Sequence, residues 1–131
     1  MANGAQKNTL NDKGETKVFH WENKILAFIF CCGGAGRVGV SITTIRDYTE
    51  VDYARIQNYL DPNKKDGPIE QQLVERFHEF RKGEKKSLYY INRDDESVTG
   101  KMEAVMLDMS LCKEPHIKKL YKKFHKLWLE N

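Results

Sequence analysis

The sequence has few of the features that stabilise small secreted proteins or anchor membrane proteins. It contains three cysteines, two of them adjacent, and an odd number does not suit a disulfide framework. Its longest uncharged apolar run, residues 25–32, is well short of the roughly 18 residues that a membrane-spanning helix needs. RNA-recognition aromatic signatures, zinc fingers and glycine–lysine phosphate loops are also missing. A membrane span and a disulfide scaffold are therefore excluded.

Apolar residues are nevertheless abundant enough for a folded core. They make up 40% of the 131 residues and include six Phe, six Tyr and two Trp. We predict a single globular domain over residues 16–131, preceded by a flexible arm over residues 1–15 that has almost no apolar pattern. Glu15 and Glu22 precede the apolar run, which argues against a signal peptide. We therefore expect a cytoplasmic protein that is not secreted.

Positive charge is concentrated at the C-terminal end of the chain. The formal net charge is +3, from 22 Lys and Arg against 19 Asp and Glu. Residues 113–131 contain six Lys and two Glu, so this segment carries +4 and the remaining 112 residues carry −1. This distribution predicts a local contact with an anionic partner, because the body of the protein is balanced.

The apolar pattern predicts an α+β fold built on an antiparallel sheet of about five strands, with helices packed on it. Residues 25–32 are continuously apolar and rich in aromatic and β-branched side chains, which is typical of a central strand. The expected order is β-β-β-α-α-β-β-α. Its elements are strands at 17–21, 25–32 and 38–45, helices at about 49–60 and 68–82, strands at 87–92 and 101–109, and a final helix from residue 114.

A glycine-rich segment, residues 33–37, follows the first long apolar run. We interpret it as a hairpin turn, because glycine readily adopts positive φ. Residues 38–45 are rich in β-branched side chains, so they favour a strand over the helix that a phosphate-binding loop requires. Residues 34–39 also match Gly-x-Gly-x-x-Gly, but no acidic residue follows at the position that a dinucleotide-binding fold needs.

The same segment allows a catalytic interpretation. Cys31, five intervening residues and Arg37 resemble the signature loop of the cysteine-dependent protein tyrosine phosphatases. The resemblance implies that a Cys31 thiolate attacks phosphorus while Arg37 holds the phosphate oxygens. Two positions depart from that family's pattern, namely Phe30 in place of His and Val38 in place of Ser or Thr.

Metal ligands and acid–base groups are sparse. Cys112 and His116 form one close pair, whereas zinc sites usually show two such pairs. The remaining histidines, His20, His78 and His125, are scattered along the chain. We therefore predict no metal site, no cofactor and no catalytic residue.

The strongest functional signal is a pair of basic clusters. The final helix has five lysines within nine residues on the sides that flank an apolar stripe, and a second cluster lies near residues 76–86. Such lysines can contact phosphates while the apolar stripe packs on the protein. The residues predicted to bind nucleic acid are Lys118, Lys119, Lys122, Lys123, Lys126, Arg81, Lys82, Lys85 and Lys86.

These observations lead to one main hypothesis and two alternatives. The main hypothesis is a small non-enzymatic binding protein that contacts an anionic partner, nucleic acid first, through its basic C-terminal helix. The first alternative is a protein–protein interaction module or a homodimer, using an exposed sheet edge or the aromatic residues of the final helix. The second is a cysteine-dependent phosphatase that uses Cys31 and Arg37.

Overall fold

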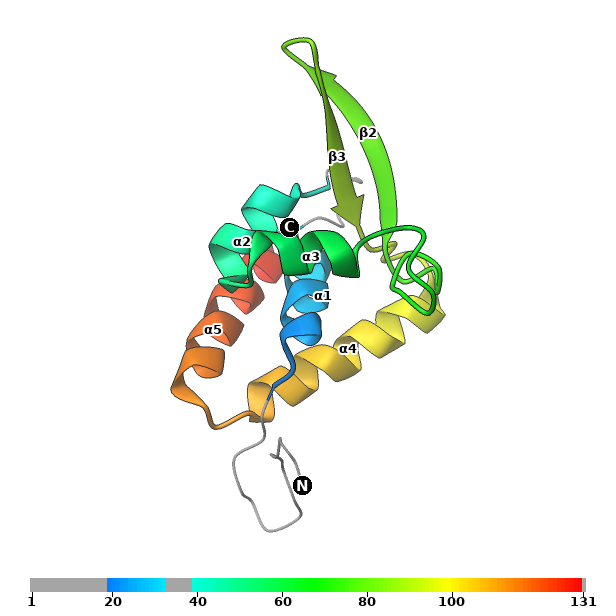
Figure 1. Ribbon diagram of the computed structural model, residues 1–131. Helices are drawn as coiled ribbons and strands as arrows, with labels where there is room; N and C mark the ends of the chain where they lie inside the picture. The colour runs from blue at the N-terminus through cyan, green and yellow to red at the C-terminus, as the bar shows by residue number, and fades with distance from the viewer. Residues whose placement is uncertain (1–18, 33–38, 131) are drawn as a thin grey trace.

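The structure, a computed structural model, describes residues 19–32 and 39–130 (Figure 1). Within them, five helices and a two-stranded antiparallel sheet form an α+β fold in which helices dominate. The predicted sheet of about five strands is therefore wrong. The elements are α1 (Trp21–Cys32), α2 (Ile42–Thr49), α3 (Tyr53–Tyr59), β2 (Glu75–Arg81), β3 (Glu84–Tyr90), α4 (Glu96–Leu111) and α5 (Pro115–Glu130).

Helix α1 is the centre of the core. Residues 25–31 are all buried, and α1 packs against α2, α4, α5 and β3. The predicted strand at 25–32 is wrong because an unbroken apolar run has no period, so it fits a helix covered on every side as well as a central strand. The strand expected at 17–21 is also absent at its described end, where Trp21 begins α1; residues 17 and 18 lie outside the described residues.

The strand predicted at 38–45 is mostly replaced by helix α2. Val40 forms an isolated antiparallel bridge with Tyr89 of β3, and α2 begins two residues later. Ser41 caps α2, since its Oγ accepts a hydrogen bond from the Thr44 backbone N–H at 3.2 Å. This cap satisfies a backbone donor of the first turn and so favours a helix over an extended chain.

Strands β2 and β3 form a hairpin, residues 75–90, that projects from the helices (Figure 1). The helix predicted at 68–82 is wrong. Its apolar spacing coincided with a helical period, but Lys82 and Gly83 both have positive φ, 51° and 79°. Two successive residues with positive φ make a tight hairpin turn, so Gly83 turns the chain between strands instead of ending a helix.

Helix α4 includes the whole segment predicted as a strand at 101–109. The carboxylate of Asp95 accepts hydrogen bonds from the backbone N–H groups of Ser97 at 3.1 Å and Val98 at 3.5 Å. Val98, Met102 and Met109 are buried along one side of the helix. The strand prediction is wrong because Asp95 caps a helix that begins at Glu96 and continues through residues 101–109.

Helix α5 lies where the final helix was expected, and α3 lies within the predicted helix at 49–60. β3 begins three residues before the strand predicted at 87–92. The arm expected over residues 1–15 lies outside the described residues. No helix in the described part of the chain has both the length and the apolar character to cross a membrane.

Candidate nucleic-acid interface

Helices α2 and α3 pack against each other across a turn of three residues, 50–52. Glu50 takes the left-handed conformation, with φ 61°, and its backbone N–H donates to the Arg46 carbonyl at 2.8 Å. Val51 is buried and anchors the turn to the core. Two helices joined by a turn of three residues have the chain order of a helix-turn-helix.

The second helix, α3, divides its side chains between the core and an open groove. Ile56 and Tyr59 are buried, and Tyr59 packs edge-on against Trp21 of α1. Tyr53 and Gln57, one turn apart, line the groove and are exposed. The core contacts therefore hold α3 in a fixed orientation that presents Tyr53 and Gln57 outward.

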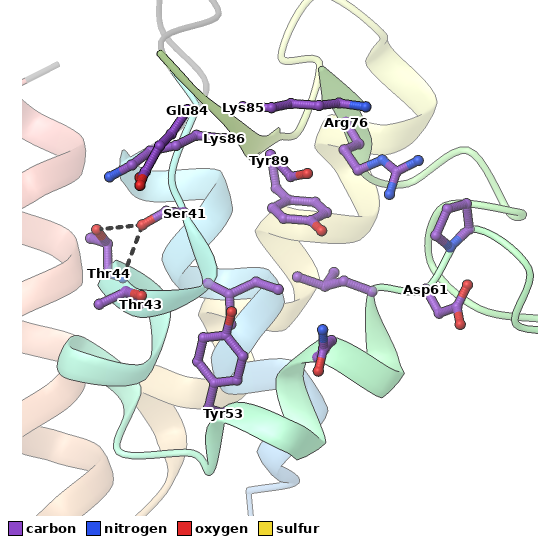
Figure 2. Close-up of a pocket in the computed structure, with 15 residues that line it drawn as sticks. Ser41, Thr43, Thr44, Tyr53, Asp61, Arg76, Glu84, Lys85, Lys86 and Tyr89 are labelled. Carbon is purple, nitrogen blue, oxygen red and sulfur yellow. Dashed lines mark hydrogen bonds between the residues drawn. The ribbon is translucent and has the colours of Figure 1, made fainter. Parts of the chain in front are cut away.

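The groove has a volume of about 740 Å³ and is bounded by three elements: the start of α2, α3 with the residues that follow it, and the hairpin. Figure 2 shows the rings of Tyr53 and Tyr89 on opposite sides of the groove, with both hydroxyl groups directed into it. Lys85 and Arg76 lie on the α3 side of the hairpin, and Lys86 extends to the other side (Figure 2). Acidic residues are present at the margin, namely Asp61 and Glu84.

The register of the hairpin separates its charges between two faces. Residues paired directly across the two strands share a face, and the faces alternate along each strand. All three acidic residues of the hairpin, Glu75, Glu79 and Glu84, fall on one face by this register. The other face, which we name the basic face, consists of Arg76, His78, Phe80, Lys85, Ser87 and Tyr89.

Cations on the basic face lie close enough to affect one another. The pKa of His78 is lowered, first by desolvation and then by the positive charges of Lys85 and Arg76. The His78 ring pairs with the hydroxyl of Ser87 across the strands at 3.1 Å. Burial raises the pKa of Tyr89, while Arg76 opposes this rise through its charge and a hydrogen bond. The face therefore carries positive charge that an anion would neutralise.

The predicted nucleic-acid residues fall on two separate elements. Lys82, Lys85 and Lys86 are exposed on the hairpin, and Arg81 lies in β2 opposite Glu84. The five predicted lysines of α5 are also exposed, on a helix that packs against α1 and α4. The structure thus does not bring the two basic clusters together.

The environment of Cys31 does not favour a nucleophilic cysteine. Its side chain is fully buried in the last turn of α1, with its Sγ 3.6 Å from the Met106 sulfur. Burial raises the pKa of the Cys31 thiol to about 12. Reactive thiolates need the opposite, a pKa lowered by exposure, nearby cations or a helix N-terminus. Arg37 lies outside the described residues.

The glycine segment, residues 33–38, also lies outside the described residues, but the elements beside it are clear. It is preceded by helix α1, so the hairpin interpretation and the dinucleotide interpretation both lose the strand they require. In residues 19–32 and 39–130, no three His, Cys, Asp or Glu side chains gather in a way that could hold a metal ion.

Sequence reasoning missed the groove residues on α3 and at the base of the hairpin, Tyr53, Gln57 and Tyr89. The available signal for the hairpin was the Lys82-Gly83 pair, because glycine suits the second position of a two-residue hairpin turn. Comparisons with protein-family models, with curated proteins and with solved structures find no match to this chain.

Proposed function

We propose that this chain binds double-stranded DNA, with α3 in the major groove and the hairpin on the neighbouring backbone. One observation carries the proposal: a helix-turn-helix and the basic face of a hairpin border the same open groove. Along the chain, α1 is followed by Val40, then by α2 and α3, and then by the hairpin. Val40 forms its β-bridge with Tyr89 of that hairpin.

The exposed side of α3 has suitable chemistry for contact with base edges. An α-helix fits the major groove of B-DNA, which is about 12 Å wide. The amide of Gln57 can donate to and accept from adenine, and Tyr53, one turn earlier, can reach the backbone or a thymine methyl. These two side chains lie on the groove side of α3, so both can face the same duplex.

The surrounding elements can hold the phosphates. Arg76 and Lys85 lie on the basic face, and the exposed hydroxyl of Thr43 lies in the first turn of α2, beside the groove. Arg, Lys and hydroxyl side chains make most of the phosphate contacts in protein–DNA complexes and set the register of the protein on the duplex. The predicted interface thus moves from the C-terminal helix to the hairpin and α3.

The test compares two variants with the same change of charge. Lys85→Ala with Lys86→Ala removes two lysines from the hairpin, and Lys122→Ala with Lys123→Ala removes two from α5. Binding to a generic duplex, to single-stranded DNA and to RNA is measured by fluorescence anisotropy at two salt concentrations. We expect the hairpin variant to weaken duplex binding and to lower the salt dependence by about one to two ions, while the α5 variant has little effect.

The other outcomes are equally informative. A larger loss in the α5 variant would identify the C-terminal helix as the interface and would contradict the proposed role of the hairpin. Preference for single strands or RNA would contradict the major-groove role of α3. If the wild-type protein does not bind any of the three nucleic acids at low salt, the proposal is wrong.

Self-association is a second candidate function, favoured by an apolar stripe on α4. Leu107 and Leu111 are one turn apart and 58% and 65% exposed. Exposed leucines in adjacent turns are typical of a surface that another helix covers. Sedimentation velocity of the wild type and of Leu107→Glu tests this, with Leu129→Glu on α5 as the control. A dimer that only Leu107→Glu dissociates would support self-association, and a monomeric wild type would exclude it.

A further inference from the structure

Phe80 is a large apolar side chain in an unusual position at the outer end of the hairpin. Its side chain is 73% exposed, more than that of any other Phe, Tyr or Trp that the structure describes. It lies one residue before the end of β2 and pairs with Lys85 across the strands. A phenylalanine exposed in this way adds little to the stability of the fold, and its whole ring is available to contact a partner.

The basic face leads directly from the groove to Phe80. Along β2, this face presents Arg76, then His78, then Phe80, and the cross-strand partners are Tyr89, Ser87 and Lys85. Four residues of strand cover about 13 Å, so Phe80 lies about that distance beyond Arg76 at the groove. A duplex that contacts both α3 and Arg76 would continue along this face toward the tip.

The hairpin holds Phe80 in a defined place. Lys82 and Gly83 form a two-residue turn with positive φ at both positions, which matches the twist of the flanking strands. The strands remain paired as far as Arg81 and Glu84. Such a tip has few alternative conformations, and an apolar group that it carries can therefore be inserted without a large ordering cost.

We propose that Phe80 inserts between base pairs from the minor groove and bends the duplex. This inference rests on the proposed DNA binding and adds the contact made by the hairpin tip. Apolar side chains such as phenylalanine act as wedges in several minor-groove proteins, where they partly unstack a base step and bend the DNA. The bend would bring the flanking phosphates toward the hairpin and increase the protein surface they contact.

Charge complementarity favours DNA as the occupant of this surface. Phe80 is flanked by Lys85 across the strand and by Lys82 in the turn, both exposed, and no acidic residue of the hairpin lies on its face. Lysines beside an apolar wedge can bind the phosphates on the two edges of the minor groove. An apolar protein partner would instead be opposed by the desolvation of these lysines.

The experiment measures affinity and bending together. A duplex of about 20 base pairs carries a fluorescence donor at one end and an acceptor at the other, so that bending raises energy transfer. The proteins are the wild type, Phe80→Ala, Phe80→Leu and Lys85→Ala. We expect the wild type to bend the duplex and Phe80→Ala to abolish the bend and weaken binding about tenfold, with unchanged salt dependence. Phe80→Leu should retain most of the bend, because leucine can also act as a wedge.

The controls separate the wedge from DNA binding itself. Lys85→Ala should lower the salt dependence by about one ion while the bend remains. Binding without a bend, or an equal bend with Phe80→Ala, would overturn the wedge and leave the proposed DNA binding standing. Absence of binding by the wild type would overturn both. A change in the elution volume of free Phe80→Ala, with DNA binding intact, would identify the tip as a self-association surface and also overturn the wedge.

Discussion

The guanidinium group of Arg93 stacks on the indole ring of Trp128, with its central carbon 4.4 Å from the ring centre. The same group donates hydrogen bonds to the carbonyl oxygens of Phe30 and Cys31, at distances of 2.6–3.0 Å. These carbonyls belong to the last turn of α1, where carbonyl oxygens commonly accept hydrogen bonds from groups outside the helix. Arg93, in the loop before α4, therefore ties the end of the central helix to α5.

Replacement of Arg93 should destabilise the fold. Arg93→Ala leaves the final carbonyls of α1 without this donor and removes the stack on Trp128, and we expect the free energy of unfolding to fall by about 2–3 kcal/mol. Arg93→Lys keeps the charge but loses the planar fork, so it should recover less than half of the loss. Urea denaturation followed by tryptophan fluorescence measures both variants. Equal stability of wild type and Arg93→Ala would show that this contact does not stabilise the fold.

Gly39 and Gly83 form a matched pair for testing how the hairpin is held. Both have positive φ, 75° and 79°, but only Gly39 is crowded. A Cβ at Gly39 would lie 2.8 Å from Leu88 Cβ and 2.8 Å from a ring carbon of Phe77, whereas nothing lies within 4 Å at Gly83. We expect Gly83→Ala to cost about 1–2 kcal/mol from backbone strain alone. Gly39→Ala should cost about 2–4 kcal/mol, since overpacking adds to the strain.

The comparison of these two variants in thermal or urea unfolding is informative in either direction. A larger loss of stability for Gly39→Ala supports close contact between residue 39 and the face of the hairpin that carries Phe77 and Leu88. Equal losses would mean that the hairpin moves away without cost, and would contradict the packing of Phe77 and Leu88 against Gly39.

The stability of the protein should decrease at alkaline pH because of Cys31. Burial raises the pKa of this thiol from 9.0 to about 12. Between these values the unfolded chain loses the proton while the folded chain keeps it, so the equilibrium moves toward the unfolded state. The expected slope is about 1.4 kcal/mol per pH unit above pH 9, and no contribution is expected below it. Denaturation of the wild type and Cys31→Ala from pH 7 to pH 11 measures it. The same slope in both proteins would show that Cys31 is not its source.

DNA binding should raise the pKa of His78. In the free protein, desolvation and the charges of Lys85 and Arg76 lower it. Phosphates on the basic face would neutralise those charges and favour the protonated ring, so affinity should also rise as the pH falls through this pKa. Nuclear magnetic resonance of the histidine rings, with and without duplex, measures the change. The ring signals of His125 on α5 serve as the control and should not shift. A His78 titration that DNA leaves unchanged would place the interface elsewhere.

The elements that sequence analysis found were those with a strong period and clear ends. Helix α5 has an apolar stripe through Ile117, Leu120 and Phe124, and it begins at Pro115. Its lysines cover the rest of the helix surface, and this combination is typical of an amphipathic helix and not of a strand. α3 was also expected, because Ile56 and Tyr59 are spaced for one helix face and Pro62 follows.

The errors in the predicted elements have one physical cause. A short apolar run does not by itself determine whether it folds as a helix or as a strand. Residues 25–31 are apolar without interruption, and only the packing of α2, α4, α5 and β3 around them distinguishes a buried helix from a buried strand. In the hairpin, Phe77 and Phe80 are spaced as on a helix, yet they fall on opposite faces of β2. The local spacing of these apolar residues is therefore compatible with a helix and with a strand.

The proposed site overlaps the residues predicted from the sequence only on the hairpin. The charge pattern indicates Lys82, Lys85 and Lys86, and all three are exposed there. Tyr53, Gln57 and Tyr89 could not be joined to them from the sequence, because the groove exists only once β3 pairs with Val40 and α3 packs on the core. Whether the α5 lysines bind nucleic acid stays a prediction.

The sequence by itself determined how much apolar surface the chain can bury, where its positive charge is concentrated and where the final helix runs. Those properties follow from residue types and their local order. Tertiary structure alone decided that residues 25–32 form a helix, that two lysine clusters lie apart, and that α3 and the basic face border one groove. The reason is that contacts between distant segments select among local structures whose intrinsic free energies differ little.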